Sequence, residues 1–278
     1  MNRKNLFLLL KYDIKNVIII HWKYFIAEIF LCIFVFFCFL LNLRNNTINN
    51  LGEINFGIVD IVLTFFIGNK PLNGDIHNQI NLSIPWITFH ALQLFLTGFY
   101  AYEDLSKKSQ LYLIRVRSKK VWLISKSIWC FFSVCFYYMI FFLIAFLFVL
   151  CYGNINFLYN EELLISFFKL DFLDINPIDL LISIFIKPIF VSCFFSEIEM
   201  ILSLFFKPIY VYISFFSYII ISACYCSPLL IYNYSIVCRI TSLASFKISW
   251  MFVVFAMTII MICVFIFGIF KIQKKDVM

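Results

Sequence analysis

Charged residues are scarce in this chain. They make up 13% of its 278 residues, while hydrophobic residues make up 64% and the mean hydropathy is +0.98. A soluble globular domain is about half apolar and about one quarter charged. The shortage of charge therefore excludes a water-soluble core and indicates an all-α protein that lies in a bilayer.

Glycine is also rare, with seven residues. A phosphate-binding loop needs closely spaced glycines whose backbone N–H groups surround the phosphates, followed by Lys and Ser or Thr. The glycines here are scattered, so any energy for work must come from a partner subunit. The HExxH and GxSxG patterns are absent as well, which argues against an enzyme.

Ten cysteines are present, but none has the CxxC spacing of zinc or redox sites. The closest pair is Cys224 and Cys226. Most of the others lie in apolar runs, where a free thiol behaves as a small hydrophobe, so we expect no metal site. Cys151 and Cys238 are expected to face the outside, and the sequence leaves open whether they form a disulfide bond.

Six segments are apolar over roughly 20 residues, the length that a helix needs to cross a hydrocarbon core about 30 Å thick. The sequence therefore predicts a single transmembrane domain, 1–278, with six membrane-spanning helices. The expected spans are 24–43, 84–102, 121–151, 181–204, 209–227 and 249–270.

Lysine and arginine alternate across these spans. They are frequent in the N-terminal segment, in the loop 103–120 and in the C-terminal tail, whereas the loops after the first and third spans are net acidic. Basic loops stay in the cytoplasm, so both termini are expected there. The composition, rich in Phe, Ile, Asn and Lys, is typical of an AT-rich bacterial genome and favours the bacterial plasma membrane. We expect no cleaved signal peptide, because no small-residue cleavage site follows the short run Leu6–Leu10.

Two further segments are expected to lie at the membrane surface. Residues 1–20 predict an amphipathic helix in the membrane plane, with a disordered basic segment as the alternative. Its apolar face contains Leu6, Leu10, Ile14 and Val17, and its basic face contains Lys4, Lys11 and Lys15. Residues 56–67 are apolar but too short to cross, so we expect an interfacial or re-entrant segment.

The expected spans contain ionisable residues, among them Glu28, His90, Lys187, Glu197 and Glu199. Ionisable groups in hydrocarbon cost free energy, so each is a candidate for function. Glu197 and Glu199 are candidates for binding a cation, relaying protons or facing a polar partner. The alternative for Glu28, Glu197 and Glu199 is that they reach the inner lipid headgroups. The alternative for Lys187 is that it extends to the outer headgroups, and for His90 that it makes only hydrogen bonds in the core.

The loop 103–120, called the basic loop below, has acidic residues first and bases later, as a short helix with a favourable dipole would. Its arginines and its apolar contact suit a docking surface for another protein. A topology signal that only contacts lipid headgroups is the alternative.

The region of the basic loop contains Tyr102-Glu103-Asp104, then a run from Tyr112 to Trp122 that includes Arg115-Val116-Arg117-Ser118-Lys119, and then Lys126. In these residues it resembles the corresponding loop of ATP-binding-cassette transporter permeases of the type-2 exporter class. The stretch from Ser227-Pro228 to Tyr234 and the C-terminal Phe267–Lys271 are similar to that family too.

The resemblance implies a permease subunit that pairs with a second permease, identical or different, and with a cytoplasmic ATPase that carries ATP and magnesium. It also implies that the basic loop is a coupling helix. The candidate coupling residues are Glu103, Asp104, Arg115, Arg117 and Lys119. Membrane lipids are the other expected partners, and nucleic acid is not one. A membrane scaffold or immunity protein and an integral membrane enzyme remain the alternatives.

Overall fold

The structure is a computed structural model in which every described residue lies in a helix, a turn or a connecting loop. It describes residues 7, 9–15, 22–49, 56–69, 82–104, 119–156, 160, 163, 177–240, 243, 246 and 248–274. No strand occurs among these residues, so the expectation of a helical protein is confirmed for them.

Each of the six apolar segments forms a helix. These are α2 (Trp22–Asn49), α4 (Ile84–Glu103), α6 (Lys119–Tyr152), the run from α8 (Pro177–Leu181) into α9 (Lys187–Ser203), α10 (Pro208–Cys224) and α12 (Trp250–Lys274). Four stretches in the described part are long and apolar enough to cross a membrane: Trp22–Arg44, Lys119–Tyr152, Ile178–Ser203 and Trp250–Gln273. The other two helices are α4, which carries several polar residues, and α10, which has 17 residues. The count of six spans stays a prediction.

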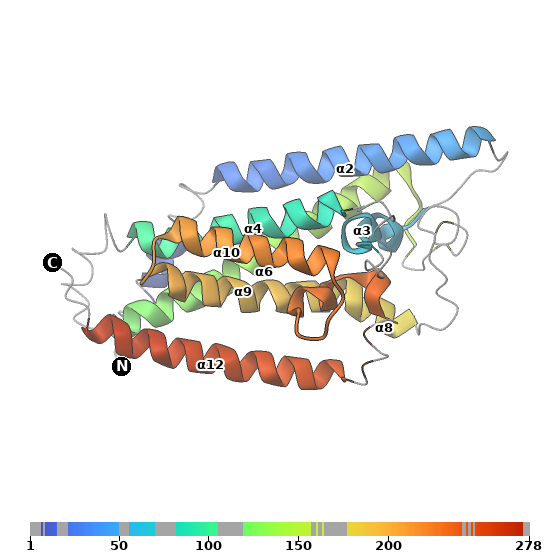
Figure 1. Ribbon diagram of the computed structural model, residues 1–278. Coiled ribbons are helices and arrows are strands. Elements are labelled where there is room, and N and C mark those ends of the chain that lie inside the picture. Colours follow the sequence, from blue (N-terminus) through green and yellow to red (C-terminus); the bar gives the residue numbers. More distant parts are fainter. Residues whose placement is uncertain are drawn as a thin grey trace.

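Helix α9 lies at the centre of the bundle, where it packs against α4, α6, α10 and α12. In Figure 1, α2 and α12 lie along opposite edges, with the other long helices between them. Half of the span Ile178–Ser203 is buried inside the protein, against 17% of the span in α12. The outer helices therefore present most of their apolar surface to the surroundings, as expected in lipid.

A π-helical turn, η2 (Ile182–Ile186), joins α8 to α9. Pro188 follows it in the first turn of α9 and has no backbone N–H, so the regular hydrogen-bond ladder cannot continue through this point. A wider turn accommodates the break. The carbonyl oxygen of Pro188 accepts a hydrogen bond from the hydroxyl of Tyr138, at 3.0 Å.

The apolar segment after α2 forms a short buried helix, α3 (Ile58–Phe66), which packs against α2, α4 and α6. It is seen end-on in Figure 1, so its axis runs across the bundle. Asp60 accepts hydrogen bonds from the backbone N–H groups of Gly57, at 2.9 Å, and Asn160, at 3.2 Å. Burial raises the pKa of Asp60 to about 6, although these two N–H groups favour the charged form.

The connection between α10 and α12 folds back over the end of α10 through two 3-10 turns, η3 (Ile231–Ser235) and η4 (Val237–Arg239). Arg239 is fully buried there, and its guanidinium donates hydrogen bonds to the backbone carbonyls of Ser222, Ala223 and Tyr225 and to Asn233 Oδ1. The cation thus satisfies the carbonyls that a helix leaves open at its C-terminus. No disulfide bond joins Cys151 to Cys238.

Residues 9–15 are helical, as expected for the N-terminal segment. Lys11, Ile14 and Lys15 are exposed, while Leu9 and Asp13 are buried against the bundle. The helix therefore has an inward face in addition to the apolar and basic faces that the sequence predicts. Leu6, Val17 and Lys4 lie outside the described residues.

Candidate functional site

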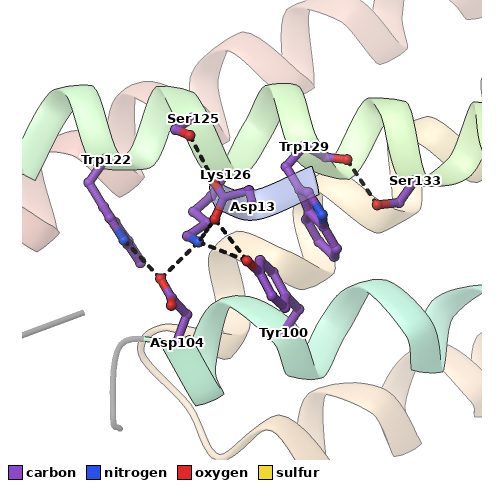
Figure 2. A network of polar contacts seen from close by, with 8 residues as sticks. All are labelled: Asp13, Tyr100, Asp104, Trp122, Ser125, Lys126, Trp129 and Ser133. Atoms are coloured by element: carbon purple, nitrogen blue, oxygen red, sulfur yellow. Dashed lines mark hydrogen bonds and ion pairs between the residues drawn. The ribbon is translucent and has the colours of Figure 1, made fainter. Parts of the chain in front are cut away.

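The most highly charged buried group lies where the N-terminal helix meets α4 and α6 (Figure 2). The ammonium group of Lys126 lies 2.5 Å from Asp13 Oδ1 and 2.8 Å from Asp104 Oδ2. The side chains of Lys126 and Asp13 are 1% and 0% exposed. These three residues are called the Lys126 cluster below.

Neutral donors complete the Lys126 cluster. The hydroxyl groups of Tyr100 and Ser125 each donate to Asp13 at 2.8 Å, and the indole N–H of Trp122 donates to Asp104 at 3.2 Å. Tyr100 in turn stacks on Trp129, with ring centroids 4.0 Å apart. Two carboxylates share one cation, and three N–H or O–H donors support the excess negative charge.

The Lys126 cluster ties three elements together. Asp13 belongs to the N-terminal helix, Asp104 directly follows α4, and Lys126 lies two turns inside α6. Removing one partner of a buried ion pair leaves a charge that nothing compensates, at a cost of about 3–5 kcal/mol. The ends of α4 and α6 are therefore held to each other and to the N-terminal helix.

A second group of polar side chains lies between α4 and α9, deep in the bundle. His90 Nδ1 lies 3.2 Å from Ser192 Oγ, and Ser192 Oγ lies 2.8 Å from the hydroxyl of Tyr138. One turn further along, Gln93 Nε2 donates to Ser196 Oγ at 2.5 Å. His90, Gln93, Ser192 and Ser196 are called the α4–α9 polar seam below.

Several polar atoms at and beyond the polar seam have no hydrogen-bond partner among the described residues. They are His90 Nε2, Gln93 Oε1 and both carboxyl oxygens of Glu199. Glu199 is 1% exposed. Buried polar groups are normally paired, because leaving one without a partner costs free energy. Glu199 is therefore a candidate for holding a proton or another ligand.

The other ionisable residues predicted inside the spans have separate environments. Glu197 is buried and accepts a hydrogen bond from Ser127 Oγ at 2.8 Å, and Glu28 is fully buried with no partner for either oxygen among the described residues. Lys187 donates to Ser183 Oγ at 2.7 Å and lies 5.6 Å from the ring centroid of Trp250. The structure thus does not bring Glu28, Glu197 and Lys187 into one site.

The predicted coupling residues are placed differently from one another. Asp104 is buried in the Lys126 cluster, whereas Glu103, its neighbour, is exposed. Lys119 donates to the backbone carbonyl of Gln273 in α12 at 3.4 Å. Arg115 and Arg117 lie outside the described residues.

Sequence reasoning missed Asp13 and the role of Lys126. Asp13 follows Leu9 by four positions, so the two share a face that is neither the apolar nor the basic face of the predicted helix. An acidic residue that lies on neither of the two predicted faces could have indicated a contact between this helix and the bundle. In the described part of the chain, no three His, Cys, Asp or Glu residues gather closely enough to hold a metal ion.

No protein-family model matches this chain, and neither does any curated protein or solved structure. The resemblance to exporter permeases therefore rests on the motifs of the sequence alone.

Proposed function

We propose that the chain is the membrane-spanning subunit of an ATP-driven exporter of the ATP-binding-cassette type. It moves a peptide, an antibiotic or another amphipathic molecule across or out of the bacterial plasma membrane. A separate cytoplasmic subunit binds and hydrolyses ATP with magnesium, and a second permease subunit, identical or different, completes the transporter.

The observation that carries this proposal is the anchoring of the basic loop at its base. The loop leaves the bundle at Asp104 and re-enters it at Lys119, and the Lys126 cluster joins Asp104 to α6 through a contact of 2.8 Å. A force on the loop therefore acts on α4 and α6 together instead of bending the loop alone. A coupling element needs this property, because ATP-driven movement of a partner has to reach the helices.

The contacts at one end of the bundle support an even number of spans with both terminal segments on one side of the membrane, and the positive charge of the basic loop favours the cytoplasm for that side. Lys126 contacts Asp13, and Lys119 contacts the backbone of Gln273. The N-terminal helix, the start of α6 and the end of α12 therefore lie together. If these three elements lie on one side of the membrane, the chain crosses an even number of times between them. Six spans meet this condition, with two crossings between the N-terminal helix and α6 and four from the start of α6 to the end of α12.

The position of α9 supports a role in the passage of a polar or amphipathic molecule. It is the central helix, and it carries Glu197, Glu199 and two serines of the polar seam. Ionisable residues inside a membrane bundle face its interior or a water-filled cavity and mark substrate or ion pathways. Alternating exposure of the α4–α9 interface is the movement that this arrangement favours.

The decisive experiment purifies the tagged chain from its native membrane in mild detergent and identifies the proteins bound to it. We expect an ATPase with a Walker motif in the wild-type sample and its loss from the variant Arg115→Glu/Arg117→Glu. The matched control is Lys207→Glu, which reverses one exposed charge in the short connection between α9 and α10. This control should retain the ATPase.

Three outcomes contradict the proposal. An impermeant amine reagent that labels Lys120 from outside intact cells would place the basic loop on the wrong side. Absence of any ATPase from the wild-type sample, with no ATP-dependent export, would favour a scaffold or immunity protein. Turnover of a substrate by the isolated chain would favour a membrane enzyme.

A further inference from the structure

A groove of about 330 Å³ opens on the side of the bundle, between the N-terminal helix, α2 and α6. Ile14 and Phe25 form one wall, and Phe132, Phe136 and Met139 of α6 form the other. These three residues of α6 are 56%, 41% and 53% exposed, so the groove opens to the surroundings of the bundle. It is called the lateral groove below.

The lateral groove has the length of one half of a bilayer core. Along α6 it extends from Trp129 to Met139, which is about 15 Å at 1.5 Å per residue. The hydrocarbon core of a membrane is about 30 Å thick, so each leaflet contributes about 15 Å. An acyl chain that enters at the interface would therefore fill the groove from end to end.

Two exposed ammonium groups belong to the N-terminal helix, which forms one wall of the lateral groove. Lys11 and Lys15 are both exposed and are four positions apart, so they lie on the same face of the N-terminal helix. Ile14, next to Lys15, lines the groove itself. The helix thus presents positive charge next to a residue that lines the groove.

No exposed carboxylate on these two elements offsets that charge. The acidic residues of the described N-terminal helix and of α2 are Asp13 and Glu28, and both are fully buried. Asp13 is in addition held by Lys126. Lys23, at the start of α2, is exposed as well.

We propose that the lateral groove binds an anionic membrane phospholipid, with one acyl chain along Phe132, Phe136 and Met139 and the phosphate at Lys11 and Lys15. The apolar walls accept any acyl chain, and the ammonium pair selects the anionic headgroup. This binding site does not depend on the proposed ATPase partner or on transport. Its ligand is a resident lipid that holds the N-terminal helix against α6.

The test uses the full chain in vesicles that contain equal amounts of phosphatidylglycerol and phosphatidylcholine. In one sample phosphatidylglycerol carries a photoreactive diazirine in the middle of an acyl chain. In the other sample phosphatidylcholine carries it. Mass spectrometry then locates the labelled residues. We expect phosphatidylglycerol to label residues 132–139 more strongly than phosphatidylcholine does.

The variant Lys11→Gln/Lys15→Gln should remove this preference while the chain still inserts, because both side chains are exposed. A lysine near the headgroups favours anionic lipid by about fivefold, so the labelling ratio should fall by about that factor for each lysine. Lys207→Gln, an exposed lysine far from the groove in sequence, should leave the ratio unchanged.

Two results would overturn the proposal. Equal labelling by the two lipids in the wild-type chain would mean that the lateral groove is ordinary lipid-facing surface without headgroup selectivity. Labelling of Phe255, which is 62% exposed on α12, without labelling of residues 132–139 would mean that no lipid enters the groove.

Discussion

Gly98 of α4 lies directly against the carboxyl group of Glu199 of α9. A β-carbon at position 98 would lie 2.6 Å from both Cδ and Oε1 of Glu199, so the carboxyl group would have to shift. The absence of a side chain at Gly98 is therefore what leaves room for a carboxyl group in the α4–α9 interface.

The first prediction concerns this contact. Gly98→Ala should lower the free energy of unfolding by about 1–3 kcal/mol, because the added methyl group forces α4 and α9 apart or displaces Glu199. Thermal unfolding of the purified chain in detergent measures the loss. Glu199→Ala should make Gly98→Ala nearly neutral, because the two groups are in contact and their effects do not add. Additive losses in the double variant would show that the two positions do not interact.

The second prediction concerns the Lys126 cluster. Lys126→Met keeps an unbranched side chain, one atom shorter, and removes its charge, so Asp13 and Asp104 lose their common cation. We expect a loss of about 3–5 kcal/mol in the free energy of unfolding. The triple variant Lys126→Met/Asp13→Asn/Asp104→Asn removes all three charges and should recover much of the loss. If the single variant is as stable as the wild type, the ion pairs do not hold these elements together.

The third prediction is a dependence of stability on pH that comes from Asp60. Its pKa is raised to about 6 in the folded protein, so between about pH 4 and 6 the folded state binds a proton that the unfolded state has released. The contribution of Asp60 to the free energy of unfolding is therefore fully present below about pH 4. It is lost as the pH rises towards 6, by about 2–3 kcal/mol in all.

The matched variant for this pH dependence is Asp60→Asn, which cannot titrate. Denaturant unfolding at a series of pH values should give a curve for the wild type that falls more steeply between about pH 4 and 6 than the curve for the variant. The difference in slope is the readout, because Asn also changes the hydrogen bonds to Gly57 and Asn160 and so shifts both ends of its curve. Parallel curves would mean that Asp60 does not titrate in this range.

The fourth prediction concerns the connection after α10. Arg239→Met should expose the backbone N–H groups of residues 231–240 to hydrogen exchange, because the carbonyls at the end of α10 lose their donor. Hydrogen bonds from a charged group are worth about 1.5–3 kcal/mol each, so the local protection should fall by at least that amount. Exchange in the Lys126 cluster at the other end of the bundle should not change. A uniform increase over the whole chain would instead indicate global unfolding.

The positions of the helices could be predicted well from the sequence, and the partners of single side chains could not. The expected span 121–151 corresponds to α6, Lys119–Tyr152, within two residues at each end. Arg239, by contrast, looks in the sequence like an ordinary loop charge, yet its side chain is buried and donates to five acceptors. Glu197 and Glu199 are adjacent in the pattern, but only Glu197 finds a donor, from Ser127.

The sequence by itself determined that this is a helical protein of the membrane, where its helices lie, and which ends carry positive charge. These are local properties, because the length of an apolar run and the density of lysine and arginine need no knowledge of the fold. Only the tertiary structure decided that Asp13 and Lys126, 113 positions apart, form a buried ion pair and that Gly98 faces Glu199. Such contacts depend on how whole helices pack, and the spacing of residues along one helix does not contain that information.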